Sequence, residues 1–572
     1  MNPYTLKEPH AEDAKKKLGV YSELLQELLL NRGITTPEAA EVYLNPDYDA
    51  HLHDPFLMKN MGKVVDRLLE AIKNEESIVI YSDYDCDGIP GGVLLHDFFK
   101  KIGYKYFKNY IPHRHHEGYG LNVEAMEKFG KEGVKVLISV DCGITDVGPV
   151  EKANEYGIDV IITDHHQTPE ILPSAFAILN SKQDDDTYPY DMLCGTGVVF
   201  KLVQALIERG KERGGITIPV GWEKWWLDVV GIATIADMVP LTGENRVLAR
   251  YGLQVLRKSR RPGIIHLCRK MYMKQFSLTE DDVGFMIAPR INAASRMDVP
   301  MDAFKLLATD SEVEAGTLSN HLDKINNTRK GMVGAITREV KKRIEEGGEE
   351  LKEVIVMGNP DWKPTLLGIV ANNIAEIYKR PTFFWGRDGG EHLKGSCRSG
   401  DNTDVMQLMT AVPAGVFLEF GGHAFSGGFS TPHEKIHELE DALLKAYANI
   451  DKNNVVEPVY IDKKLSLDAV SWSTYKELEK MMPFGQGNEK PLFLFEDVAI
   501  EAVKDFGKEK NHLQIDFEKA FGGKVSAIGF FKTVADFDGA LAKGKKINLV
   551  ATIEKSTFGR TTELRLRIVD II

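Results

Sequence analysis

The amino-acid sequence predicts an α/β protein with two α/β lobes, a long helix that joins them and a C-terminal β-barrel. Apolar, β-branched runs alternate with helical segments from residue 77 to residue 179, which is the pattern of a parallel sheet. Residues 311–346 keep a helical pattern that no Pro interrupts. From about residue 456 the chain turns to short strands, as in a small OB-like barrel.

The apolar runs of the first lobe end in polar side chains that can carry chemistry. Strands are expected at 77–82, 134–140, 160–163 and 175–179. The polar residues at these ends, with one acid from the apolar run 227–241, are Asp83, Asp85, Asp87, Asp141, Asp164, His165, His166 and Asp237. In a parallel sheet, ligands bind outside the carboxyl ends of the strands, so these residues are expected at one edge.

So many carboxylates at one edge indicate a cation site, because like charges cannot all stay ionised unless cations neutralise them. Mixed carboxylate and imidazole ligands suit Mn²⁺, and Mg²⁺ can substitute. Two ions at such a site would activate a water and clamp a phosphoryl oxygen. The alternatives for residues 83–88 (D-Y-D-C-D-G) are an Asp-rich turn or a calcium loop. A strand precedes this turn, and the later glutamate of an EF-hand is missing.

Composition limits the class of protein. The 572 residues carry a net charge of -13, which disfavours a broad nucleic-acid-binding surface but leaves room for a local basic groove. No apolar run approaches the length of a membrane span, and the first residues show no signal-peptide pattern. Five scattered cysteines without a C-x-x-C pair argue against disulfides and structural zinc. We therefore expect a cytoplasmic protein.

Several motifs together resemble the DHH phosphoesterase superfamily and, within it, the RecJ family of single-strand-specific exonucleases. Besides the acids and D-H-H, the matching stretches are 112–121 (P-H-R-H-H-E-G-Y-G-L), 289–297 (P-R-I-N-A-A-S-R-M), 395–399 (G-S-C-R-S), 421–423 (G-G-H) and 483–488 (P-F-G-Q-G-N). The resemblance covers residues 60–500 well and the ends loosely. The sequence departs from the family at Ile89 and Pro90, and it has Tyr81 where some members place a histidine.

The resemblance implies a role for each polar residue at the sheet edge. One ion is held by Asp85 and Asp141, with Asp83 as a further candidate ligand because the set for this ion stays open at Tyr81. The other ion is held by Asp87, Asp141, His165 and Asp237. Asp141 then bridges two Mn²⁺ ions, for which Mg²⁺ can substitute. His166 contacts the scissile phosphate, and Asp164 orients the histidines.

A second group of residues is expected to bind substrate. Its members are Arg114, Arg290, Asn292, Arg296, Arg398, Ser399, Gly421, Gly422, His423, Phe558 and Arg560. Guanidinium forks match phosphate oxygens, and backbone N–H groups on Gly-rich turns can approach an anion closely. For each arginine a surface ion pair remains an alternative, and for G-G-H a tight turn. On the barrel, an aromatic tip among Lys and Arg residues fits single-strand binding, with a packing role as the alternative.

The expected divisions of the chain are a helical lead-in at 1–60, a DHH phosphoesterase domain at 61–310, a connecting helix at 311–348, a DHH-associated substrate-binding domain at 349–455 and an OB-like nucleic-acid-binding domain at 456–572. The resemblance implies an exonuclease that degrades single-stranded DNA from 5′ to 3′ into mononucleotides for recombination and repair. Its implied partners are single-stranded DNA, a single-strand-binding protein and a recombination helicase. The alternative is a phosphodiesterase on oligoribonucleotides, cyclic dinucleotides or polyphosphate.

Overall fold

The computed structural model describes residues 4–347, 351–450, 458–507, 509–537, 541–557 and 562–572. The chain forms two compact units. The sheet unit consists of residues 55–237 and 255–456, and the barrel unit consists of residues 1–54, 238–254 and 457–572. The barrel unit therefore brings together three segments that are far apart in the sequence.

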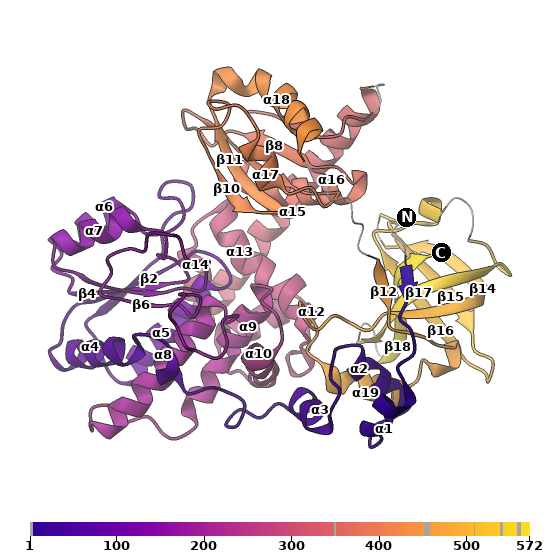
Figure 1. The fold of residues 1–572 in the computed structure, drawn as a ribbon, viewed down its shortest axis with the longest axis horizontal. Helices are drawn as coiled ribbons and strands as arrows, with labels where there is room; N and C mark the ends of the chain where they lie inside the picture. The colour runs from indigo at the N-terminus through magenta and orange to yellow at the C-terminus, as the bar shows by residue number, and fades with distance from the viewer. Residues whose placement is uncertain (1–3, 348–350, 451–457, 508, 538–540, 558–561) are drawn as a thin grey trace. The chain divides into compact units, whose positions relative to one another are not determined.

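The first sheet of the sheet unit has five parallel strands in the order β3-β2-β4-β5-β6. Their bounds are β2 Ile78–Ser82, β3 Phe107–Tyr110, β4 Val136–Val140, β5 Asp159–Thr163 and β6 Ala177–Leu179. One face carries α6 and α7, and the other carries α4, α5 and α8 (Figure 1). These helices are α4 Met61–Lys73, α5 Gly88–Lys101, α6 Val123–Lys131, α7 Val147–Glu155 and α8 Gly195–Glu212. Because helices cover both faces, β2 and β4 are buried throughout, which explains their predominantly apolar sequences.

The four predicted strands of this sheet are confirmed as β2, β4, β5 and β6, whereas β3 was not predicted. Strand β3 lies at the sheet edge beside β2, and its four residues are only partly buried. Its sequence, Phe-Lys-Asn-Tyr, contains polar residues because an edge strand is not enclosed on all sides. It therefore lacks the apolar signal that identified the other strands.

A helical region follows the first sheet and ends in the predicted long helix. Helix α15, Glu312–Glu346, has 35 residues, and the Ser311 side chain caps it by accepting a hydrogen bond from the Glu314 N–H. The preceding helices of the sheet unit include α9 Leu227–Ala236, α11 Pro262–Lys270, α13 Ala288–Met297 and α14 Met301–Ala308. Helices α11, α13 and α14 all pack against α15, so the long helix is a packing partner as well as a connection.

The second sheet has the strand order β10-β11-β9-β8-β7. Strands β7 Ile355–Gly358 and β8 Thr382–Gly386 are parallel, and the remaining pairs are antiparallel. The other strands are β9 Leu393–Arg398, β10 Glu419–His423 and β11 Ser426–Thr431. Helices α16 Pro364–Tyr378 and α18 Ile436–Asn449 complete this second α/β lobe.

In the barrel unit, five strands close on themselves, which confirms the predicted OB-like barrel. The pairing runs β14-β15-β16-β18-β17, and β17 pairs with β14 to close the ring. The strands are β14 Phe493–Phe506, β15 His512–Glu518, β16 Lys524–Phe530, β17 Lys546–Ser556 and β18 Glu563–Ile571. Closure leaves no long edge strand among these five.

The N-terminal helices of the barrel unit share a hydrophobic core with the barrel. Leu25, Leu28 and Leu29 of α2, Glu23–Leu30, belong to the same buried cluster as Phe493 and Leu549. Strand β1, Tyr4–Leu6, pairs in parallel with β12, Val459–Ile461. Helix α3, Pro37–Leu44, has Thr36 as its cap and Pro at its first position. The expected lead-in is thus an integral part of the unit that contains the barrel.

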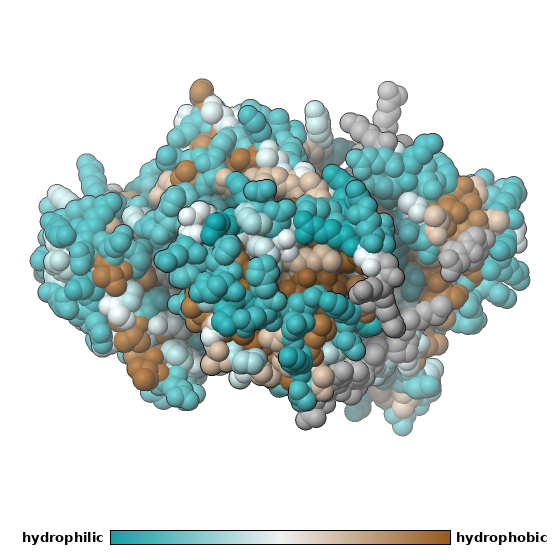
Figure 2. Space-filling model, turned by 90° about the horizontal axis from the view of Figure 1, so that it is seen from above, coloured by the Kyte–Doolittle hydropathy of each residue, from teal (hydrophilic) through white to brown (hydrophobic). Residues whose placement is uncertain are grey.

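Within the described part of the chain, no helix combines the length and the apolar composition that crossing a membrane would need. The face drawn in Figure 2 is mostly hydrophilic, with hydrophobic side chains in separate patches. The five cysteines are all buried and free.

Candidate metal centre

The acids of the first sheet are held side by side by the sheet itself. Asp83, Asp141 and Asp164 directly follow β2, β4 and β5. The Asp83 N–H donates to the carbonyl oxygen of Val140 at 3.0 Å, and the Asp141 N–H donates to that of Thr163 at 2.9 Å. The ladder of backbone hydrogen bonds therefore continues one residue past the strands and fixes the spacing of the carboxylates.

The turn after β2 is shaped by its own acids. Asp85 Oδ1 accepts hydrogen bonds from the N–H groups of Asp87 and Gly88, at 2.8 and 3.1 Å, which starts helix α5. A Cβ atom at Gly88 would lie 2.6 Å from the carbonyl oxygen of Asp83, so this position requires glycine. Asp237 arrives from another element, because it is the C-cap of α9.

Asp141 has an unusual backbone conformation, with a φ of 62° in the left-handed region. Its carbonyl oxygen accepts a hydrogen bond from the Tyr119 hydroxyl at 3.0 Å. Left-handed conformations of residues other than glycine cost free energy and concentrate at functional sites. Sequence reasoning placed Tyr119 within the E-G-Y-G-L stretch but gave no sign that its hydroxyl contacts Asp141.

The structure brings the candidate ligands together in three overlapping groups. Within each group the ligand atoms lie within 4.8 Å of one another. The groups are Asp83, Asp85 and Asp141; Asp87, His165 and Asp237; and Asp141, His165 and His166. Nε2 of His165 lies 3.2 Å from Asp141 Oδ1, 3.6 Å from Asp237 Oδ2 and 3.8 Å from Asp87 Oδ2. Asp141 thus stands in two groups, between the Asp83 side and the histidine side.

Three oxygens of this cluster are buried and accept no hydrogen bond: Asp83 Oδ1, Asp141 Oδ1 and Asp237 Oδ2. A buried carboxylate oxygen without a partner is costly and needs an explanation such as a bound ion. The donor set of carboxylates with imidazole suits Mn²⁺ and, through the carboxylates, Mg²⁺. The residues present therefore fit divalent metal ions.

The electrostatics agree with this fit. Burial raises the pKa of Asp141 well above its ordinary value, and the charges of Asp87, Asp85, Asp237 and Asp83 raise it further. Burial likewise raises the pKa of Asp83 and of Asp87. Burial, with repulsion from Asp87 and Asp85, raises the pKa of Asp237 to about 9. Without cations, these acids cannot all be ionised at neutral pH.

Asp164 behaves differently from the other acids because its oxygens are fully engaged. Oδ1 accepts from the N–H groups of His165 and His166 and is 2.7 Å from His166 Nδ1, and Oδ2 accepts from the Ile144 N–H. Burial raises the pKa of Asp164, but the bonds from His166 and Ile144 bring it below its ordinary value. Burial lowers the pKa of the His166 ring, and Asp164 more than reverses this effect. Asp164 can therefore hold His166 in place without binding a metal itself.

The candidate arginines lie in different surroundings. The Arg114 guanidinium stacks 4.8 Å from the ring of Tyr84, next to the acidic turn. Burial lowers the pKa of Arg296 to about 10, assisted by the charges of Arg114, Arg329 and Arg398. Four arginines thus gather near one another. Arg329 was not among the residues predicted to bind substrate.

Arg290 is held in a buried ion pair, whereas the alternative stated for each arginine was an ion pair on the surface. Its Nε and NH2 groups both donate to Asp323 Oδ1, at 3.0 and 2.7 Å, and its side chain is buried. Asn292 Oδ1, on the same helix α13, and Ser399 Oγ, directly after β9, are buried without a hydrogen-bond partner. These two polar atoms are available to a ligand, whereas Arg290 is already engaged.

The Gly-rich segment of the second lobe is solvent-exposed. Gly421, Gly422 and His423 lie on strand β10, whose five residues are all exposed. Gly422 has a φ of 147°, and a Cβ atom there would lie 2.3 Å from the Ser426 carbonyl oxygen. The Arg398 guanidinium lies beside α16. A Cβ atom at Gly368 of this helix would be 2.9 Å from the NH2 group of Arg398.

Two expected substrate contacts on the barrel, Phe558 and Arg560, lie outside the described residues. On the described barrel, the Arg567 guanidinium stacks 4.0 Å from the ring of Phe530, and Arg565 lies 5.6 Å from it. His512 packs against the same ring. An aromatic and basic cluster therefore exists on the described part of the barrel, with Phe530 as its aromatic residue.

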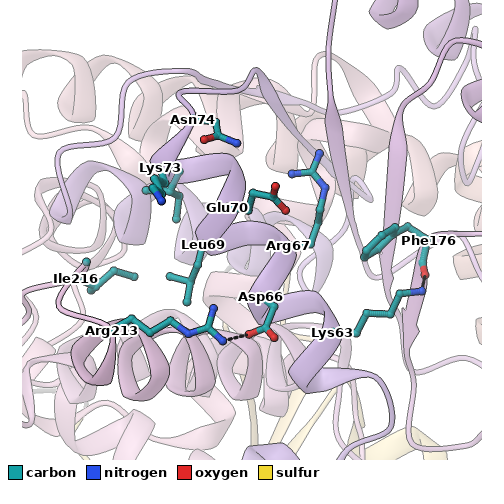
Figure 3. A pocket seen from close by; sticks show the side chains of 13 residues that line it. Lys63, Asp66, Arg67, Leu69, Glu70, Lys73, Asn74, Phe176, Arg213 and Ile216 are labelled. Carbon is teal, nitrogen blue, oxygen red and sulfur yellow. Dashed lines mark hydrogen bonds and ion pairs between the residues drawn. The ribbon is translucent and has the colours of Figure 1, made fainter.

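A separate groove of about 1070 Å³ lies along α4 and the end of α8 (Figure 3). Arg213 pairs with Asp66 at 2.9 Å, and the Lys63 amine donates to the backbone carbonyl of Phe176. None of the eight polar residues of the sheet edge lines this groove.

Comparison with protein families finds three matches along the chain. The DHH family N-terminal domain matches residues 77–234, the DHHA1 domain matches residues 351–449, and the RecJ OB domain matches residues 461–570. These ranges follow the first sheet, the second sheet and the closed barrel.

Curated relatives extend the match over most of the chain. The single-stranded-DNA-specific exonuclease RecJ of Bacillus subtilis is 32% identical over 550 residues, which cover 96% of this chain and 67% of that protein. RecJ of Haemophilus influenzae is 32% identical, covering 83% of this chain and 84% of that protein. RecJ of Escherichia coli is 31% identical, with 82% of each chain covered.

Among solved structures, RecJ of Thermus thermophilus in complex with Mn²⁺ has a TM-score of 0.81 at 24% identity and covers all of this chain and 79% of that one. The complex of the same protein with Mg²⁺ has a TM-score of 0.75 at 23% identity and covers 78% of that chain. At this level of identity the likeness shows the shared fold. From its curated relatives and its fold together, the chain belongs to the RecJ family of single-stranded-DNA-specific exonucleases.

Proposed function

We propose that this chain is a metal-dependent exonuclease that degrades single-stranded DNA from the 5′ end and releases mononucleotides. The observation that carries the proposal is the convergence of buried, unpartnered carboxylate oxygens around Asp141. Family membership supplies the substrate class, because the curated relatives are named single-stranded-DNA-specific exonucleases. The direction of degradation and the product are parts of this proposal.

The ligand groups suggest how two ions would be held. Asp83, Asp85 and Asp141 would hold one ion. The other would be held by Asp87, Asp141, His165 and Asp237. When bound, such a pair of Mn²⁺ or Mg²⁺ ions activates a water and neutralises charge on the phosphodiester. The protein fixes the positions of the carboxylate and imidazole ligands at the sheet edge. It also keeps hydrogen-bond donors away from three of the carboxylate oxygens that would bind the ions.

His166 and the arginines would handle the substrate phosphates. His166 Nδ1 is bound by Asp164, which keeps the ring oriented and leaves Nε2 for the scissile phosphate. The raised pKa of His166 favours its cationic form, which suits contact with a phosphate oxygen. Arg114, Arg296 and Arg398, with Ser399 and the Gly-rich strand β10, would bind the terminal phosphate. Asn292, with an unpartnered buried oxygen, would support this site.

Each division expected from the sequence has its own function in this proposal. Residues 61–310 hydrolyse the phosphodiester, residues 349–455 bind the end of the DNA strand, and the barrel from residue 456 onward binds a more distant part of the same DNA strand. Closed barrels with aromatic and basic side chains bind single strands by stacking and phosphate contacts. We also propose a cytoplasmic enzyme that works with a single-strand-binding protein and a recombination helicase.

One assay tests the proposal. Purified protein is given Mn²⁺ and equal amounts of 5′-labelled single strand, 3′-labelled single strand, duplex and a ribodinucleotide. We expect a 5′-labelled strand to release labelled mononucleotide at once, while a 3′-labelled strand shortens progressively. The Asp141→Ala variant is the control for contaminating nuclease. Preferred cleavage of the ribodinucleotide would instead support the phosphodiesterase alternative.

A further inference from the structure

The first turn of helix α8 forms a tight contact with one acid of the metal centre. The N–H of Gly195 donates to Asp87 Oδ2 at 2.6 Å, and the N–H of Thr196 donates to Asp87 Oδ1 at 2.8 Å. The Thr196 hydroxyl donates to the backbone carbonyl of Asp87 at 2.6 Å. All three residues are buried, so water cannot replace these bonds.

These bonds control both the charge and the direction of the Asp87 carboxylate. The first N–H groups of an α-helix have no partner within the helix, and the helix dipole favours a negative charge beside them. Helix α8 has 18 residues, and its first two N–H groups, those of Gly195 and Thr196, both donate to this one side chain. Each oxygen of Asp87 accepts one N–H, so the carboxylate cannot rotate and keeps only its remaining lone pairs for a ligand.

Glycine at position 195 allows this approach. A Cβ atom there would lie 2.7 Å from both Cβ and Oδ1 of Asp141. Contacts this short do not occur, so any side chain would push Asp141 away from its place between the ligand groups. The same turn therefore binds Asp87 by hydrogen bonds and touches Asp141 by close packing.

We propose that Gly195 and Thr196 are positioning residues of the metal centre, which hold Asp87 and Asp141 at the separation that two ions require. The proposal rests on the metal-dependent function proposed above. Outer partners of metal ligands typically contribute 10–100-fold to metal affinity. Because Asp87 is the candidate ligand to which Thr196 hydrogen-bonds, loss of the hydroxyl should affect mainly the ion held by Asp87, His165 and Asp237. Because Gly195 abuts Asp141, a side chain there should affect both ions.

The test is calorimetric titration of the full-length, metal-free protein with Mn²⁺, without substrate, together with electron paramagnetic resonance of the bound Mn²⁺. Thr196→Val should lower the affinity for one Mn²⁺ ion by about 10–100-fold and change the affinity for the other by no more than about twofold. Thr196→Ser should restore the wild-type isotherm because it keeps the hydroxyl. Gly195→Ala should lower the affinity for both ions. It should also remove the coupling of a Mn²⁺ pair from the electron paramagnetic resonance spectrum.

Gly197→Ala is the matched control in the same helical turn. The nearest side-chain atoms would lie 3.4 Å from its Cβ, an ordinary contact with Leu193, so binding of both ions should stay normal. Equal losses in Gly197→Ala and Gly195→Ala would overturn the proposal, as would an unchanged isotherm in Thr196→Val or a failure of Thr196→Ser to restore binding. If the wild-type protein itself binds no Mn²⁺, the proposed metal-dependent function fails instead.

Discussion

Nε2 of His165 lies 3.2 Å from Oδ1 of Asp141, an oxygen that accepts no hydrogen bond. The same nitrogen is 3.6 Å from Asp237 Oδ2, which also accepts none. His165 therefore stands between two carboxylates that it does not satisfy. A cation among these atoms would bind all three groups at once, and only Asp141 would also reach the Asp83 side.

Asp141→Ala should abolish catalysis and disturb both ions, whereas Asp237→Ala should disturb one. The rate should fall by more than the roughly 10–100-fold that follows loss of an outer-shell partner. The fold should survive, because removing one of several crowded acids relieves repulsion. Mn²⁺ calorimetry and nuclease rates measure the two variants, with circular dichroism as the folding control. A folded Asp141→Ala protein that binds two ions and cuts normally would overturn the bridging assignment.

The metal-free protein should become less stable as the pH rises, and Asp237 should account for part of this loss. The pKa of Asp237 is raised from 3.8 to about 9 by burial and by neighbouring acids. The folded protein thus holds this proton more tightly than the unfolded chain. The stabilising contribution is complete below pH 3.8 and is lost as the pH rises through about 9.

Thermal unfolding of metal-free protein between about pH 5 and 9 checks this expectation. Relative to wild type, Asp237→Asn should gain stability as the pH rises, since it carries no charge to bury. Adding Mn²⁺ should reverse the trend for wild type, because ions displace protons and bind more tightly at higher pH. Parallel stability profiles for the two metal-free proteins would contradict the assignment.

Arg398→Ala should erase the preference for 5′-phosphorylated over 5′-hydroxyl single strands. Bidentate guanidinium contacts to phosphate are strong and geometrically selective. Arg398→Lys should recover only part of the preference because lysine keeps the charge but not the fork. Arg387→Ala, an exposed arginine of the same lobe, is the matched control. If Arg398→Ala retains the preference, the terminal phosphate binds elsewhere, with Arg114 as the next candidate.

A double variant of the barrel, Phe530→Leu with Arg567→Gln, should weaken binding to long single strands and spare hydrolysis of very short ones. Loss of one stacked base costs roughly 1–3 kcal/mol, so the affinity should fall at least about fivefold. The salt dependence should also decrease, by about 0.7 in logarithmic slope for one lost phosphate contact. Lys524→Gln, at the other end of β16, serves as control. Unchanged affinity and slope would exclude this face from strand binding.

Substitution is preferable to truncation before residue 456 for this test. Leu25, Leu28 and Leu29 bury themselves in the same core as the barrel. Removing the barrel would expose these leucines to water, so a truncated chain would report on misfolding as well as on strand binding.

Arg261→Met should destabilise the sheet unit strongly. Arg261 donates to Asp228 at 2.8 Å and pairs with Asp97 at 2.6 Å, and all three side chains are largely buried. Removing one partner leaves buried charges uncompensated and typically costs about 3–5 kcal/mol. The midpoint of thermal unfolding measures the loss, with Arg260→Met as the exposed neighbour for comparison. A midpoint equal to that of the Arg260 variant would show that the network contributes little.

The sequence was informative where one short segment determines one structural feature. Strands β2, β4 and β5 are buried on both faces, so their apolar runs stand out, and Asp83, Asp141 and Asp164 mark their ends. The capped start of α3 at Thr36 is equally local. Fewer than ten consecutive residues determine each of these features.

Other features depend on residues that meet only after folding. The ion pair between Arg290 and Asp323 and the contact of Thr196 with Asp87 leave no local pattern. Nor does the packing of Leu25 against the barrel core, because an amphipathic helix does not specify which surface it will cover. Strand β3 was not predicted because it lies at the sheet edge. An edge strand does not need a continuous apolar sequence, so β3 lacks the pattern that identified the other strands.

The parallel pairing of β1 with β12 has a consequence for synthesis on the ribosome. Ser22 donates a hydrogen bond to Glu477, 455 positions later in the chain. At elongation rates of about 5–20 residues per second, the N-terminal helices wait roughly 20–90 s for these neighbours to emerge. The strands of the first sheet leave the ribosome long before that. Newly made chains therefore carry the unburied leucines of α2 through most of translation, and these leucines are a natural target for chaperones.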